Sequence, residues 1–115
     1  MPSTAKYRFI VSMDVAPEKE ALFNEVYDQE HIPNLLEVPG VLSATRVKAE
    51  PFTLNIAGAA KEVPVAGPAY TAIYELASAE VLASEAWGRA VEAVRWPGEV
   101  RPFTTNRRHV LAKVI

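Results

Sequence analysis

The sequence predicts an α+β fold in which a four-stranded antiparallel sheet carries two helices on one face. Two observations lead to this prediction. Segments with alternating apolar and polar residues, typical of strands, occur near both ends and in the middle of the chain. Segments with apolar residues at helical spacing follow the first and the third of these strands. The resulting order of elements is β-α-β-β-α-β.

The first strand and the first helix have the clearest patterns. Residues 7–15 alternate from Tyr7 onward, so one face of this strand is suited to a core. Pro17 suits the first position of a helix, and apolar residues then recur at helical spacing as far as His31. Because a residue before proline is pushed out of the helical region, we expect the helix to end before Ile32-Pro33.

The middle of the chain contains two further strands. The VPG sequence at 38–40 is a turn signal, and residues 41–49 resume an extended pattern. Residues 51–68 are rich in Ala, Gly and Pro and alternate only faintly, so an extended hairpin and a long loop both fit. Residues 69–76, which contain AIYEL, predict the third strand of the main sheet.

A second helix and a last strand complete the domain. Ser78 suits an N-cap, and we expect the helix that follows it to end at Trp96-Pro97-Gly98. Residues 107–115 are rich in β-branched residues and predict the final strand. Two strand–helix–strand halves with parallel crossovers form a ferredoxin-like plait. The helices of such a plait cover only one face of the sheet.

The other face of the sheet is expected to meet a second copy of the chain. The last strand has Val110, Ala112 and Val114 on one face and Leu111 and Ile115 on the other, and the third strand also has apolar residues on both faces. A monomer would leave one apolar face in water. We therefore expect a homodimer that packs sheet to sheet.

Length and composition exclude several classes of protein. The 115 residues fit a single domain spanning residues 1–115, with 50% hydrophobic and 23% charged residues. A net charge of −2 argues against a general nucleic-acid binder. The sequence has no cysteine, which excludes disulfides, thiolate nucleophiles and cysteine-ligated metal centres. No stretch reaches the ~20 apolar residues of a membrane span, so we expect a cytoplasmic protein without membrane partners.

Three residues near the end of the first helix are candidates for catalysis. Tyr27 and His31 are four residues apart, so they lie on one side of the helix and approach the same space between helix and sheet. An imidazole can exchange a proton near neutral pH, and a tyrosine hydroxyl can stabilise an oxyanion. The alternative is that His31 caps the helix end. Glu30 falls within the apolar arc, so its carboxylate is paired, protonated or functional, or else is solvated at a frayed helix end.

Other polar and aromatic residues allow two interpretations each. His109 on the last strand is expected at the dimer interface or a sheet edge. Arg46, Arg107 and Arg108 are either neutralised and solvated or hold an anionic substrate. The same choice, between core packing and an aromatic-lined pocket, applies to Tyr70, Tyr74 and Trp87. The sequence has no phosphate-binding glycine motif, and two histidines 78 residues apart do not predict a metal site.

The run YDQEHIPNLL at 27–36, followed by VPGVL at 38–42, resembles the EthD-like branch of the dimeric α+β barrel superfamily. In that branch an acidic–His–x–Pro run ends the first helix, and a PG turn begins the second strand. The AIYEL strand at 72–76, the helix expected after it and the closing strand are also similar, so the resemblance spans nearly the whole chain. The segment 51–68 departs from it by its length, which allows a lid or an additional dimer contact.

The resemblance implies a barrel of two facing sheets, with a cavity between sheet and helices in each subunit. It also implies that His31 is catalytic, with Tyr27 and Glu30 in support. Functions within the superfamily are diverse and include isomerases, polyketide cyclases, cofactor-free monooxygenases, aldoxime dehydratases and haem-handling enzymes. Fold alone therefore does not select the reaction.

From these observations we expect a small catabolic enzyme, of isomerase or lyase type, that transfers protons without cofactor or metal. Its substrate would be a compact aromatic or cyclic carbonyl compound. His31 would act as general base, oriented by Glu30 or Asp28, and Tyr27, with Asn34 or Arg46, would stabilise an enolate. Alternatives are a cofactor-independent monooxygenase and a non-catalytic accessory protein that binds a small molecule; a haem protein is a further, weaker alternative.

Overall fold

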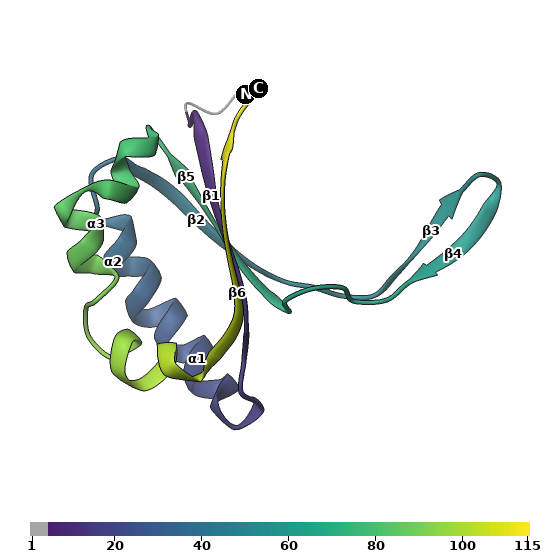
Figure 1. Cartoon of the computed structure of the whole chain (residues 1–115), viewed down its shortest axis with the longest axis horizontal. Helices are drawn as coiled ribbons and strands as arrows, with labels where there is room; N and C mark the ends of the chain where they lie inside the picture. Colours follow the sequence, from purple (N-terminus) through teal and green to yellow (C-terminus); the bar gives the residue numbers. More distant parts are fainter. Residues whose placement is uncertain (1–4) are drawn as a thin grey trace.

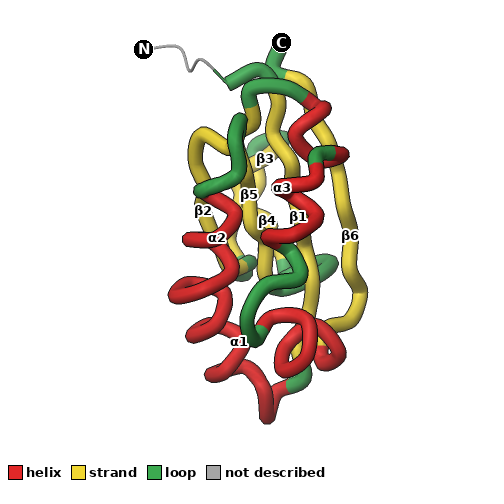
Figure 2. Tube along the Cα trace, turned by 90° about the vertical axis from the view of Figure 1, so that its left-hand side faces the viewer, coloured by secondary structure: helices red, strands yellow, loops and turns green. Residues whose placement is uncertain are grey.

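The computed structural model describes residues 5–115, and its centre is a four-stranded antiparallel sheet. The sheet contains β1 (Tyr7–Val15), β2 (Val41–Lys48), β5 (Tyr70–Leu76) and β6 (Thr104–Lys113) in the order β2-β5-β1-β6. All helices lie on one face of this sheet (Figures 1 and 2). The predicted sheet with helices on one face is therefore confirmed. No helix among the described residues is both long and apolar enough to cross a bilayer.

The first helical segment is longer than predicted. It begins with a 3-10 turn (Pro17–Lys19) and continues through α1 (Glu20–Val26), a π turn (Tyr27–His31) and α2 (Ile32–Leu36). The expectation that the helix ends before Ile32-Pro33 is wrong.

The π turn explains why a proline is tolerated inside this segment. The backbone N–H of Ile32 donates to the carbonyl of Tyr27, five residues earlier, which widens the helix by one residue. Pro33 then lies in the first turn of α2, where its missing N–H is not needed. The local rule that ends a helix before proline is overridden by this wider turn.

The second helical region is also broken differently from the prediction. It consists of a 3-10 turn (Ala79–Ala83), the short α3 (Glu85–Ala90), a π turn (Trp96–Val100) and a 3-10 turn (Arg101–Phe103). The backbone of Ser84 is extended, and its hydroxyl accepts a hydrogen bond from the Trp87 N–H at 3.2 Å. Ser84 rather than Ser78 is therefore the side-chain N-cap. Trp96 begins a turn instead of ending the helix.

The segment between β2 and β5 forms a separate hairpin. The sequence had left both a hairpin and a long loop open here. Its strands are β3 (Phe52–Ile56) and β4 (Ala59–Val63), joined through Ala57 and Gly58, which both have positive φ, as a tight hairpin turn requires. We call residues 52–63 the arm. In Figure 1 the arm extends far from the sheet on the side opposite the helices. All arm residues except Val63 are exposed.

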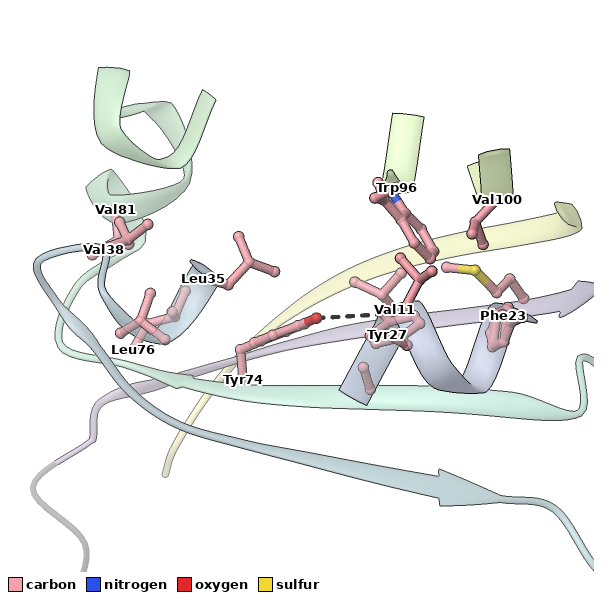
Figure 3. Packing of buried hydrophobic residues seen from close by; sticks show 14 residues of the cluster. Val11, Phe23, Tyr27, Leu35, Val38, Tyr74, Leu76, Val81, Trp96 and Val100 are labelled. Carbon is pink, nitrogen blue, oxygen red and sulfur yellow. Dashed lines mark hydrogen bonds between the residues drawn. The ribbon is translucent and has the colours of Figure 1, made fainter. Parts of the chain in front are cut away.

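The core fills the space between the sheet and the helices (Figure 3). Its buried members are Val11, Met13, Phe23, Val26, Tyr27, Leu35, Val38, Val41, Ala72, Tyr74, Leu76, Val81, Trp96 and Val100. On the opposite face of the sheet, Ile10 pairs with Ile73 on β5 and with Val110 on β6. No described helix covers this second face.

Candidate active site

A cavity of about 240 Å³ lies between the first helix, the sheet and the turns that precede β6. Five aromatic side chains and four basic side chains line it, together with aliphatic groups. The rings belong to Phe9, Tyr27, Tyr74, Trp87 and Trp96, and the polar side chains to His31, His109, Arg101 and Arg107. This composition, mostly apolar with few polar groups, is typical of a small-molecule site.

His31 is the buried polar residue of this cavity. It lies in the π turn with 6% of its surface exposed, and its Nδ1 has no hydrogen-bond partner. The imidazole stacks on the Trp96 ring, with centroids 4.2 Å apart, and meets the Tyr27 ring edge-on at 5.1 Å. Because the helical segment continues to Leu36, His31 does not cap a helix end. His31 and Tyr27 border the same cavity between helix and sheet, where their four-residue spacing predicted them to lie.

The electrostatics of the cavity keep His31 neutral. Burial is the main cause that lowers the pKa of His31 to about 4; the Arg101 charge lowers it further, while Glu92 opposes the shift. The imidazole is therefore unprotonated at neutral pH and is able to accept a proton.

Two tyrosines place hydroxyl groups in the same region. The Tyr27 and Tyr74 hydroxyl oxygens are 3.4 Å apart (Figure 3), long for a hydrogen bond between hydroxyls. Burial raises the pKa of Tyr27 and that of Tyr74, so both phenols stay protonated. A bond this weak leaves both hydroxyls able to turn toward an oxygen atom of a bound molecule.

Glu30 has a different partner from the one expected. Its carboxylate accepts hydrogen bonds from Nε of Arg95 at 2.6 Å and from the Arg95 backbone N–H at 3.2 Å. Arg95 is also 3.0 Å from Glu25, and its guanidinium lowers the pKa of Glu30. No hydrogen bond joins Glu30 to His31. Glu30 instead ties the π turn to the residue directly before Trp96, and so holds together the two segments that bring His31 and Trp96 into contact.

Other residues expected at the site lie outside the cavity. Arg46 donates to Asp28 at 2.7 Å and to Asn24 at 2.8 Å, so Asp28 is not available to orient His31. Tyr70 donates to Glu20. Neither Arg46, Tyr70 nor Asn34 borders the cavity, although the Arg46 guanidinium lies 4.4 Å from the centroid of the Tyr27 ring.

Tyr74 and Trp87 do line the cavity, and so do Trp96 and Arg101, which sequence reasoning did not place there. Trp96 was expected only to end a helix. Arg101 was not singled out at all.

His109 was expected at the dimer interface or a sheet edge; it lies on β6, an edge strand of the sheet, and its side chain is on the face that carries the helices. Its ring stacks on Phe9 with centroids 5.9 Å apart. His109 pairs with Val11, which is buried in the core, so the two side chains share a face of the sheet. The alternation in the last strand shows which residues share a face with His109, but only the pairing with β1 shows which face is covered.

Comparisons with known proteins identify the fold. No protein-family model matches the chain, and neither does any curated protein sequence. An EthD (ethyl tert-butyl ether) family protein from Bacillus halodurans superposes with a TM-score of 0.62 at 10% identity, over 96% of this chain and 99% of that one. The haem degrader MhuD from Mycobacterium tuberculosis, solved with two haems in its active site, gives a TM-score of 0.62 at 17% identity, over 95% of each chain. The chain therefore has the ferredoxin-like fold of these proteins, as the EthD-like resemblance predicted.

The cavity volume of about 240 Å³ is below the roughly 300–1,000 Å³ of sites for drug-sized ligands, so the space that the lining residues enclose is small for a porphyrin. Among residues 5–115, no group of three or more His, Asp or Glu side chains is arranged to hold a metal ion.

Proposed function

We propose that this chain is an enzyme that uses His31 as a general base to move a proton on a compact aromatic or cyclic carbonyl compound. The observation that carries the proposal is a buried, neutral imidazole beside two protonated phenols in one cavity. An engineered cavity of about 150 Å³ takes up benzene, so the volume here suits one ring with small substituents.

The proposed reaction follows from these groups. The His31 imidazole removes a proton from the carbon next to a carbonyl, and the electron pair moves onto the carbonyl oxygen. The Tyr27 and Tyr74 hydroxyls donate hydrogen bonds to that oxygen as it becomes negative. Return of the proton to another carbon completes an isomerisation, and loss of a neighbouring group completes a lyase reaction. Both reactions share the first step, which needs no cofactor.

The homodimer belongs to the same proposal. The uncovered sheet face carries Ile10, Ile73 and Val110, and the arm extends on that side of the sheet (Figure 1). Within the arm, Phe52 and Ile56 lie on one face and are more than half exposed, at 54% and 56%. A lone two-stranded hairpin is marginally stable in water. These features support a second copy packed on the open face, with each arm lying against its partner.

Hydrogen exchange tests the proposed proton transfer without knowledge of the product. A panel of small cyclic ketones and aromatic keto compounds is incubated with the protein in D2O, and NMR follows loss of the hydrogen next to the carbonyl. We expect catalysed exchange of at least one compound, and a decrease of about 10²–10⁴-fold in His31→Asn. Gln29→Ala, an exposed position in the same π turn, is the matched control and should exchange at the wild-type rate.

The result that would overturn the proposal is exchange by folded His31→Asn at the wild-type rate. Binding of panel compounds without exchange would favour the non-catalytic accessory protein. Oxygen uptake during turnover would favour the cofactor-independent monooxygenase.

A further inference from the structure

The charges that line the cavity are all of one sign. Arg101 and Arg107 border it, and none of its lining residues is Asp or Glu. Arg101 is already neutralised: its guanidinium donates to Glu92 at 3.0 Å and to the Val91 carbonyl at 2.6 Å. Arg107 takes part in none of the ion pairs formed within residues 5–115. The cavity therefore borders one arginine whose charge no carboxylate of the described chain balances.

A β-bulge in β6 places Arg107 at the cavity. The register between β1 and β6 shifts between Ser12 and Asp14, so residues 106–107 of β6 form a bulge opposite Met13 of β1. Asn106 has a positive φ of 53°, and its side-chain amide donates to Asp14 at 2.8 Å. Bulges of this kind redirect side chains and are common beside active sites. Arg107 then shares its face of β6 with His109, whereas Arg108, paired with Ser12, lies on the opposite face.

We propose that Arg107 binds a carboxylate of the substrate, so that the compound taken up beside His31 is a cyclic or aromatic carboxylic acid. This inference rests on the proposed function and names its substrate class. A planar guanidinium matches a carboxylate with two parallel hydrogen bonds, and Arg107 is exposed at the rim of the cavity, where an entering carboxylate can reach it. With the carboxylate held at β6, the ring lies among Trp87, Trp96 and Phe9, and the carbonyl oxygen is left for the tyrosine hydroxyls.

The two tryptophans make the test direct. The chain has only two, Trp87 and Trp96, and both line the cavity, so intrinsic fluorescence reports its occupancy. The probes are benzoate and benzamide, which have the same ring and nearly the same shape but differ in charge. We expect benzoate to bind the wild-type protein about tenfold more tightly than benzamide, since a hydrogen bond to a charged group contributes about that much.

Three variants locate this preference. Arg107→Gln should weaken benzoate binding about tenfold and leave benzamide binding unchanged. Arg108→Gln removes the same charge from the next residue, on the opposite face of the strand, and should change neither affinity. Arg89→Gln, an exposed arginine paired with Glu85 on α3, is a second control away from the sheet. Circular dichroism confirms that each variant is folded.

Two results would overturn the inference: equal affinity of the wild-type protein for the two probes, or an equal loss of benzoate binding in Arg107→Gln and Arg108→Gln. These failures are distinct from failure of the proposed function. Hydrogen exchange that depends on His31, without a preference for benzoate, would refute only the role of Arg107. A preference for benzoate that depends on Arg107, without exchange, would refute the enzyme and leave an acid-binding site.

Discussion

The cavity and the arm both contain large apolar side chains, but the two regions place them in opposite environments. Tyr74 and Trp96 at the cavity are 1% and 4% exposed, whereas Phe52, Leu54 and Ile56 of the arm are 54%, 43% and 56% exposed. The residues that line the cavity come from three parts of one chain. The arm has no such surroundings in a single chain. The cavity residues can therefore form a site within one chain, whereas the exposed arm residues are free to contact another molecule.

The largest expected effect comes from replacing Trp96. Its ring packs against Phe23, Tyr27 and His31, so Trp96→Ala leaves a void among buried rings and should lower the free energy of unfolding by ~3–5 kcal/mol. Phe52→Ala in the arm should change the unfolding free energy of the monomer by less than about 0.5 kcal/mol. Urea unfolding followed by circular dichroism measures both. Similar losses in the two variants would contradict the contrast between the regions.

Replacing either cavity tyrosine, Tyr27 or Tyr74, by phenylalanine should slow the proposed reaction. Tyr27→Phe or Tyr74→Phe removes one donor to the developing oxyanion, and loss of such a donor slows reactions by about 10²–10³-fold. Tyr70→Phe removes a hydroxyl that bonds Glu20 outside the cavity, and should leave the rate unchanged. The hydrogen-exchange assay compares the three variants. An equal decrease in all three would show that the effect is general and not tied to the cavity.

The neutral state of His31 should make stability depend on pH. Its pKa is about 4 in the folded chain and 6.5 when unperturbed, so the unfolded chain binds a proton more readily. The stability due to the buried neutral imidazole is therefore fully present above pH 6.5 and is lost as the pH falls toward 4. The difference corresponds to about 3 kcal/mol. His31→Asn should remove this part of the slope when urea unfolding is measured at a series of pH values.

Carboxylates such as Glu30 and Asp14, whose pKa is also lowered by their partners, contribute their own acid sensitivity. The informative quantity is thus the difference between the two proteins. Parallel profiles for wild type and His31→Asn between pH 6.5 and 4 would show that His31 is not held neutral by the fold.

The sequence was sufficient for the order of the strands and helices of the main sheet, and for part of the candidate site. The four-residue spacing of Tyr27 and His31 predicted that they share a cavity, and this holds because the spacing is local to one helical segment. His109 and Arg107 could not be assigned in the same way. Their side of the sheet is set by pairing with β1 and by the bulge near Asn106, which are properties of the tertiary structure. Local rules also failed at Ile32-Pro33, where a π turn absorbs the proline.

The smallest expected effect per residue concerns the arm, and it is visible only in the assembly. If each arm lies against a second copy, replacing Phe52 and Ile56 by Ser should weaken the dimer by about 2 kcal/mol, as for anchors of other interfaces. The fold of the subunit and the environment of Trp87 and Trp96 should be unchanged, since the arm does not touch the cavity. Sedimentation over a range of concentrations measures the dissociation constant.

Thr53→Ala, on the opposite face of β3, is the control and should leave the dimer intact, because its side chain lies on the polar face of the arm. A wild-type chain that sediments as a monomer at every concentration would refute the dimer, whereas equal weakening in both variants would show that the apolar face of the arm is not what contacts the partner.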